Sequence, residues 1–231
     1  NYPEIRFGRK DWKVPGKFVT EMFWTGLSMA LMSAIYNLGS VILQSSINAL
    51  GSVYIAAQVG GRKLAEFFYI PGIALGTSAA TFSSQNFGAG ERARIAKGAR
   101  SGIFMYFCWW LVALVFVIFL APTAVKFITG SSNPEVIKNG VLYLRISIPM
   151  IPPMAILVIL RNILQGMRRP GMPLFCSCLE LIGKVIFALW LVPAFGYLAV
   201  CICEPVTWVI CCVVIAVAVF AIRGEFTNRH I

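Results

Sequence analysis

Six apolar stretches, each long enough to cross a lipid bilayer, occupy most of this 231-residue chain. A bilayer core of roughly 30 Å requires about 20 apolar residues in a helix. The expected membrane-spanning segments are Met22–Ile47, Val53–Phe82, Ser101–Phe127, Val136–Ile159, Leu174–Val192 and Leu198–Ile222. Because only helices and closed barrels satisfy the backbone in lipid, the sequence predicts an all-α, multi-pass membrane protein.

The placement of the basic residues indicates how the segments are oriented. Lys and Arg gather before the first apolar segment, after the second, after the fourth and after the sixth, at Arg6, Arg9, Lys10, Lys13, Lys17, Arg92, Arg94, Lys97, Arg100, Arg161, Arg168, Arg169, Arg223 and Arg229. The odd-numbered connectors hold only Lys126 and Lys138. The positive-inside rule therefore places both termini in the cytoplasm. The same placement argues that the net charge of +11 faces a membrane surface and not nucleic acid.

No pattern in the chain indicates catalysis, a cofactor or a bound metal. The sequence contains no H-E-x-x-H, and its Gly88-Ala89-Gly90 lacks the Lys-Ser/Thr of a phosphate-binding loop. The two C-x-C pairs fall in helices, where side chains two positions apart point in nearly opposite directions. We therefore expect the seven cysteines to be packing residues and the protein not to be an enzyme.

A polar stripe follows the first apolar segment. Its members share a sector of about 80° on a helix, and they are Ser33, Asn37, Ser40, Gln44 and Asn48. Lipid should not face such a stripe, so it lines a water-filled cavity or forms hydrogen bonds to neighbouring helices. With Tyr36 beside them, Asn37, Gln44 and Asn48 are candidate substrate-contacting residues.

Charged residues are also expected at membrane depth, where each central charge costs about 2.5–3.5 kcal/mol. The candidates are Arg62 and Glu66 in the second segment, Arg145 in the fourth, Glu180 and Lys184 in the fifth, and Glu204 in the sixth, with Lys63 beside Arg62. The i,i+4 spacing predicts pairs within the second and fifth segments, and Arg145 and Glu204 form a candidate interhelical pair. The Glu180/Lys184 pair is either a static link between helices or a titrating, ligand-binding pair.

Three prolines, Pro149, Pro152 and Pro153, predict a bend in the fourth segment.

Several motifs together resemble the MATE family, the multidrug and toxic compound extrusion transporters, over about residues 18–208. They are Gln44–Gly51 with Ile55–Ala57, Gln85–Glu91 with Arg94, Tyr143–Arg145, Arg161–Gly166, Glu180 with Lys184, Gly196-Tyr197, and Glu204-Pro205 with Trp208. The resemblance implies a twelve-helix fold of two six-helix lobes, of which this chain matches the C-terminal lobe. Residues 1–17 are then a cytoplasmic interlobe segment, 18–222 the transmembrane lobe and 223–231 a cytoplasmic tail.

The sequence departs from the family pattern in the first segment. Ser28 follows Gly26-Leu27 where many members have proline, and Tyr36 and Asn37 stand where sodium-coupled relatives carry a glutamate. The tenth-helix aspartate of those relatives has no counterpart either. These departures argue against a cation site of that type and leave Glu180 as the candidate coupling residue.

The resemblance implies a plasma-membrane antiporter that exports small organic, often cationic, compounds by alternating access, driven by H⁺ or Na⁺. Its expected partners are the missing N-terminal six-helix lobe and the lipid bilayer. Two alternatives remain at this point. A flippase for lipid-linked saccharides or cell-wall precursors would need Lys63, Arg145 and Lys184 to converge without acids. A non-transport membrane scaffold or subunit would need no second lobe.

Overall fold

A computed structural model describes residues 14–222 and residue 224 of the chain. Most of the predicted interlobe segment 1–17, and all of the predicted tail 223–231 except Gly224, lie outside these residues. The described part is helical throughout and contains no β-strand, as the apolar pattern predicts.

Six helical crossings follow one another along the chain. They are α1 (Gly16–Leu50), α2 (Ser52–Gly88), α3 (Arg92–Thr129), α4 with α5 (Pro134–Ser147 and Ile151–Gly166), α6 with α7 (Gly171–Ile186 and Val192–Phe195), and α8 (Tyr197–Ala221). Five of them are long and apolar enough to span a membrane, and α2 is the exception. That helix carries Arg62, Lys63 and Glu66 along its first half. All six predicted segments are present as helices.

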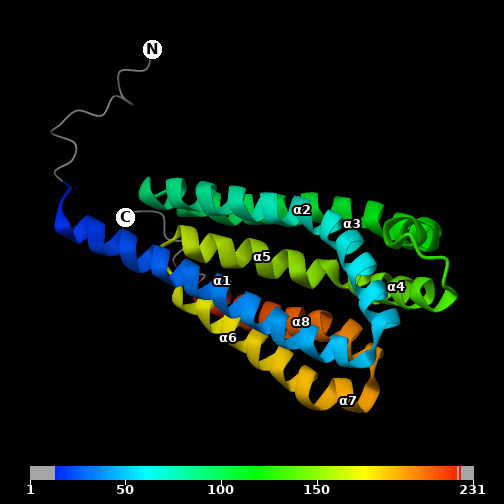
Figure 1. Cartoon of the computed structure of the whole chain (residues 1–231). Helices are drawn as coiled ribbons and strands as arrows, with labels where there is room; N and C mark the ends of the chain where they lie inside the picture. The colour runs from blue at the N-terminus through cyan, green and yellow to red at the C-terminus, as the bar shows by residue number, and fades with distance from the viewer. Residues whose placement is uncertain (1–13, 223, 225–231) are drawn as a thin grey trace.

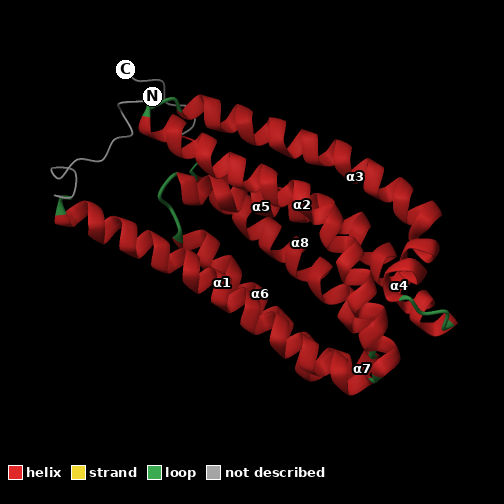
Figure 2. Ribbon diagram, turned by 45° about the horizontal axis from the view of Figure 1, so that its top comes forward, coloured by secondary structure: helices red, strands yellow, loops and turns green. Residues whose placement is uncertain are grey.

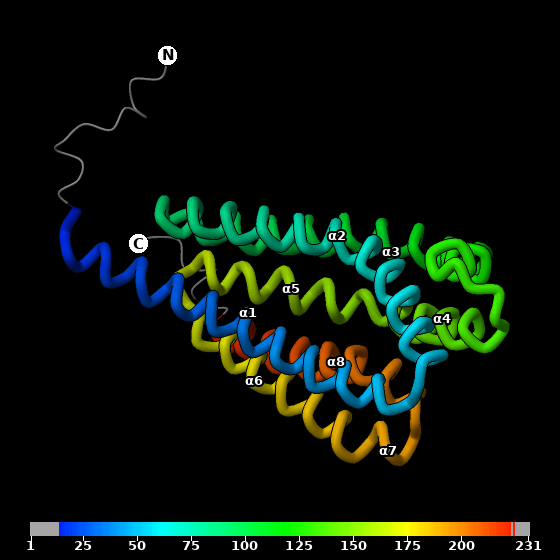
Figure 3. Tube along the Cα trace, viewed as in Figure 1, coloured from blue at the N-terminus to red at the C-terminus, as the bar shows by residue number. Residues whose placement is uncertain are grey.

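Short turns join the crossings. Gly51 links α1 to α2 at φ 107°, a backbone conformation that glycine adopts without steric cost. Asn133 caps α4 by accepting a hydrogen bond from the Glu135 amide at 2.9 Å, and Pro134 occupies the first helical position. Because successive crossings run in opposite directions, the start of α1 and the end of α8 lie toward the same end of the bundle (Figure 3).

Two crossings are interrupted. The predicted bend in the fourth is confirmed: a 3₁₀ turn at Ile148–Met150 separates α4 from α5 next to the prolines, which cannot continue the hydrogen-bond ladder. The fifth crossing contains a π-helical stretch at Phe187–Leu191, shortly before Pro193, which the apolar pattern does not predict. The Ser46 hydroxyl of α1 donates to the Ala188 carbonyl of this stretch at 3.1 Å, which holds α1 against the irregular segment.

The helices pack unequally around the core. Helix α2 packs against α3, α4 and α5, and α8 packs against α5 and α6. Helix α1 lies mainly along α6 and touches α2 little beyond their shared turn (Figures 1 and 2). Much of α1 is therefore exposed, and of the 18 residues in its most apolar part only 17% are buried. This arrangement leaves the polar stripe of α1 accessible next to α5 and α6.

Candidate functional site: a polar pocket beside a buried ion pair

A pocket of about 340 Å³ lies between α1, α5 and α6. Its lining combines a charged group, amides, hydroxyls and thioethers, and consists of Met29, Met32, Ser33, Tyr36, Asn37, Arg161, Gln165 and Ser177. Two of the predicted substrate-contacting residues, Tyr36 and Asn37, thus lie in one pocket. They reach it because α1 turns its polar side toward α5 and α6.

The other two predicted contact residues lie elsewhere. Gln44 Nε2 donates to Asn48 Oδ1 at 2.9 Å, one turn further along α1, and neither residue lines the pocket. Within the stripe, Asn37 Nδ2 donates to the Ser33 carbonyl at 2.9 Å, and the Ser40 hydroxyl donates to the Tyr36 carbonyl at 3.0 Å. The stripe is therefore partly satisfied within its own helix, and only its first half faces the pocket.

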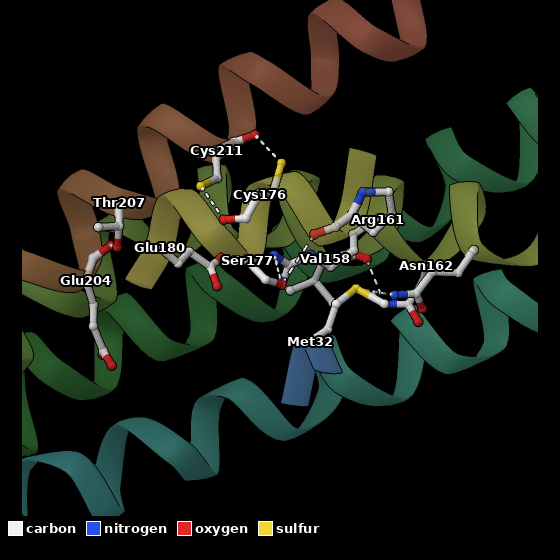
Figure 4. Close-up of polar contacts among 12 residues, drawn as sticks. Met32, Val158, Arg161, Asn162, Cys176, Ser177, Glu180, Glu204, Thr207 and Cys211 are labelled. Atoms are coloured by element: carbon white, nitrogen blue, oxygen red, sulfur yellow. Dashed lines mark hydrogen bonds and ion pairs between the residues drawn. The ribbon is translucent and has the colours of Figure 1, made fainter. Parts of the chain in front are cut away.

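The partner of Glu180 is Arg161 and not Lys184. Arg161 Nη2 lies 3.3 Å from Glu180 Oε1 and 3.3 Å from the Ser177 hydroxyl (Figure 4). The predicted Glu180–Lys184 pair is wrong because Arg161 reaches across from α5 to the side of α6 that carries both Ser177 and Glu180.

The sequence predicted Arg161 in the connector after the fourth segment, but the structure has it in a helix. Helix α5 continues to Gly166, so Arg161 lies more than one helical turn inside it. The apolar residues Ile163 and Leu164 beyond the arginine were the sequence signal that the helix continues past it. Only 19% of the Arg161 side chain and 9% of the Glu180 side chain are exposed, so the pair lies inside the lobe.

Lys184 points to α1. Its Nζ lies 3.2 Å from the Ser40 hydroxyl and 4.0 Å from the centre of the Tyr36 ring, and the residue is buried. The ring face offers a cation–π contact to the ammonium group. Close packing brings the two helices together, because Gly39 of α1 leaves room for the Lys184 stem. Lys184 makes no ion pair within residues 14–222.

Glu204 of α8 is buried and accepts a hydrogen bond from the Tyr143 hydroxyl at 3.2 Å. The predicted Arg145–Glu204 pair is not formed. Arg145 is exposed, because it follows Tyr143 by two positions on α4 and its side chain therefore points to the opposite side. The tyrosine, not the arginine, faces α8.

The predicted pair on α2 is present. Arg62 Nε lies 3.2 Å from Glu66 Oε1. Gln58, one turn earlier, accepts a hydrogen bond from the Tyr197 hydroxyl at 2.9 Å. Glu204 lies within electrostatic range of both Arg62 and Lys184.

Other chemistry-bearing side chains form local contacts. The Cys176 and Cys211 thiols each approach the other residue's carbonyl, at 3.9 and 3.5 Å, which links α6 to α8 (Figure 4). Across the described residues, no three His, Cys, Asp or Glu side chains gather as metal ligands.

Comparison with known proteins identifies the family. The family model MatE matches residues 28–190, well over half of the chain. The chain belongs to the MatE family. This assignment confirms the resemblance, and the members of the family are transporters and not enzymes. A search of curated proteins finds no match.

Solved structures share the fold of the lobe. An outward-facing multidrug resistance MATE transporter of the MOP superfamily is similar with a TM-score of 0.72 at 15% identity, and the match covers 91% of this chain and 47% of that one. A MOP superfamily transporter from Pyrococcus furiosus, described as having a binding pocket of reverse polarity, gives a TM-score of 0.68 at 15% identity and the same coverage. A MATE crystal structure in complex with MaD3S gives 0.68 at 16% identity, again with 91% and 47% covered. The chain thus spans about half the length of these transporters and has the fold of one six-helix lobe.

Proposed function

We propose that this chain is the C-terminal lobe of a cation-coupled antiporter in the plasma membrane that exports organic compounds by alternating access. The observation that carries the proposal is the buried Arg161–Glu180 pair beside the pocket between α1, α5 and α6. Charges at such depth are costly, and in membrane proteins they mark ligand and ion pathways. Membership of a transporter family supports the same conclusion.

Glu180 is the proposed coupling residue. Its carboxylate binds either Arg161 or the coupling ion, H⁺ or Na⁺. When the ion binds, the Arg161 guanidinium next to the pocket is released. Repeat-built transporters place their sites near the midplane between two halves. The other half of this transporter is proposed to be an N-terminal six-helix lobe, with the transport pathway between the two lobes. Both ends of this lobe are proposed to be cytoplasmic, from the placement of the basic residues.

The charge arrangement favours an exporter over the flippase alternative. Lys63 and Arg145 are exposed, whereas Lys184 is buried within electrostatic range of Glu180 and Glu204. The three bases do not form the acid-free cluster that a phosphate-carrying substrate would require.

Transport by the full-length protein in vesicles tests the proposal. We expect Glu180→Gln to reduce ion-gradient-driven uptake of a zwitterionic aromatic dye such as rhodamine B by about tenfold or more, because the carboxylate that exchanges partners is lost. Glu66→Gln is the matched control, since it removes an acid whose side chain is 58% exposed on α2. Unchanged uptake by Glu180→Gln, at equal protein yield, would make Glu180 a structural residue and contradict the proposed coupling.

A further inference from the structure

The pocket between α1, α5 and α6 has a one-sided charge. Arg161 is the only ionised side chain that lines it within the described part of the chain. The remaining polar lining residues carry amide and hydroxyl groups, all of which can donate hydrogen bonds. Glu180 does not line the pocket, and its side chain is less exposed than that of Arg161. A ligand in the pocket therefore meets the cation of the pair and not the anion.

The guanidinium of Arg161 keeps unused donors. A guanidinium carries five N–H groups, and among contacts within the described residues only Nη2 makes hydrogen bonds, to Ser177 and Glu180. Nε is buried and has no hydrogen-bond partner. A planar guanidinium with free donors is suited to a carboxylate, which it binds through two parallel hydrogen bonds.

The rest of the pocket suits an aromatic or apolar body. Met29, Met32 and the Tyr36 ring form its α1 wall, and thioethers pack favourably against aromatic rings. Lys184 lies over the Tyr36 ring at 4.0 Å and fixes the position of that side chain. The volume of about 340 Å³ is within the range of small-molecule sites.

We propose that this pocket binds an aromatic carboxylate, with Arg161 as the residue that recognises the carboxylate group. The inference rests on the proposed function, because it names the substrate class that this lobe takes. The ligand's carboxylate competes with Glu180 for the guanidinium. Anionic or zwitterionic aromatic compounds are therefore preferred over purely cationic ones at this site.

Calorimetric binding to the full-length protein in lipid nanodiscs tests the proposal with three probes of equal size: naphthoate, naphthamide and naphthylmethylammonium. We expect naphthoate to bind about tenfold more tightly than naphthamide, because a charge-assisted bidentate contact is added. Arg161→Gln should bring this ratio close to one. Arg145→Gln removes the same charge from an exposed position on α4 and should leave the ratio unchanged.

Glu180→Gln gives a second test that keeps Arg161 in place. Removal of the competing carboxylate should increase naphthoate affinity several-fold, so this variant decides the question if Arg161→Gln fails to fold. Equal or tighter binding of the ammonium probe, or unchanged naphthoate affinity in Glu180→Gln, would overturn the proposal. Absence of gradient-driven transport in the unmutated full-length protein, with the naphthoate preference intact, would instead contradict the proposed antiport and leave the carboxylate site standing.

Discussion

Three of the buried polar side chains in this lobe form hydrogen bonds to partners on other helices. Arg161 of α5 bonds to two residues of α6, Tyr143 of α4 bonds to Glu204 of α8, and Lys184 of α6 bonds to Ser40 of α1. In lipid, a polar group without a partner is costly. Each of these contacts therefore fixes how two helices lie against one another.

The Tyr143–Glu204 contact should stabilise the lobe measurably. Tyr143→Phe removes the donor from a buried carboxyl, and we expect a loss of ~1–3 kcal/mol, since hydrogen bonds to buried acceptors of this kind are worth that much when one partner is deleted. Thermal unfolding in detergent measures the effect. Tyr54→Phe is the control, because the Tyr54 ring stacks on Tyr197 and its hydroxyl makes no hydrogen bond within the described contacts. Equal stability of the two variants would show that the contact contributes nothing.

Sequence reasoning at this scale identified the charged residues but not all of their partners. Spacing along one helix correctly predicts the ion pair between Arg62 and Glu66, because both side chains belong to α2. It fails for Glu180, whose partner comes from another helix. Likewise, the two-residue offset puts Tyr143 and Arg145 on opposite sides of α4, so only one of them can face Glu204. Which one does so depends on the rotation of α4 in the bundle, which the sequence does not show.

At the scale of helices, close approach depends on small residues at crossing points. Helix α5 touches α2 at Gly166, where a Cβ would fall on the Ala80 carbonyl oxygen and the Ser83 hydroxyl. Ser83 itself donates to carbonyls of its own helix and lies 3.4 Å from the Ile163 carbonyl of α5. Small residues at such points let backbones pack closely in membranes.

Gly166→Ala should therefore separate α2 from α5. We expect a destabilisation of ~1–3 kcal/mol, as for other overpacked sites, because the backbone carbonyl cannot move aside. The matched control is Gly102→Ala on α3, where the new methyl group would lie 3.5 Å from Ile159 Cδ1 in ordinary contact. The two midpoints of thermal unfolding should differ clearly. A Gly166→Ala midpoint equal to that of the control would contradict the described α2–α5 contact.

The apolar pattern predicts the elements better than their irregularities. Six runs of sufficient length specify six helices, and three prolines in five residues specify the break between α4 and α5. The apolar pattern alone does not predict the π-helical stretch at Phe187–Leu191. Pro193 follows this stretch and cannot donate to the Leu189 carbonyl, but it lies in the predicted connector, where a proline does not indicate a helix irregularity. The stretch's hydrogen bond from Ser46 is a tertiary contact and is visible only in the folded lobe.

At the scale of the whole molecule, the exposed surface of the lobe differs from helix to helix. Most of its exposed side chains on α3 and α8 are large and apolar, as a lipid-facing surface requires. The exposed half of α1 differs, because Ser33 and Asn37 lie in the pocket beside Arg161. We propose that this pocket belongs to the aqueous transport pathway.

Thiol labelling in vesicles tests that claim most directly. In full-length protein with the seven cysteines of this lobe and any cysteines of the other lobe replaced by alanine, Asn37→Cys places a thiol in the pocket. Leu38→Cys places one at the next, exposed position of α1 outside it. A charged, membrane-impermeant reagent should label Asn37→Cys about tenfold faster or more, since a thiol reacts as the hydrated thiolate. A transported substrate should slow that reaction. Equal, slow labelling at both positions would contradict the account, because it would place the α1 stripe in a dry interface.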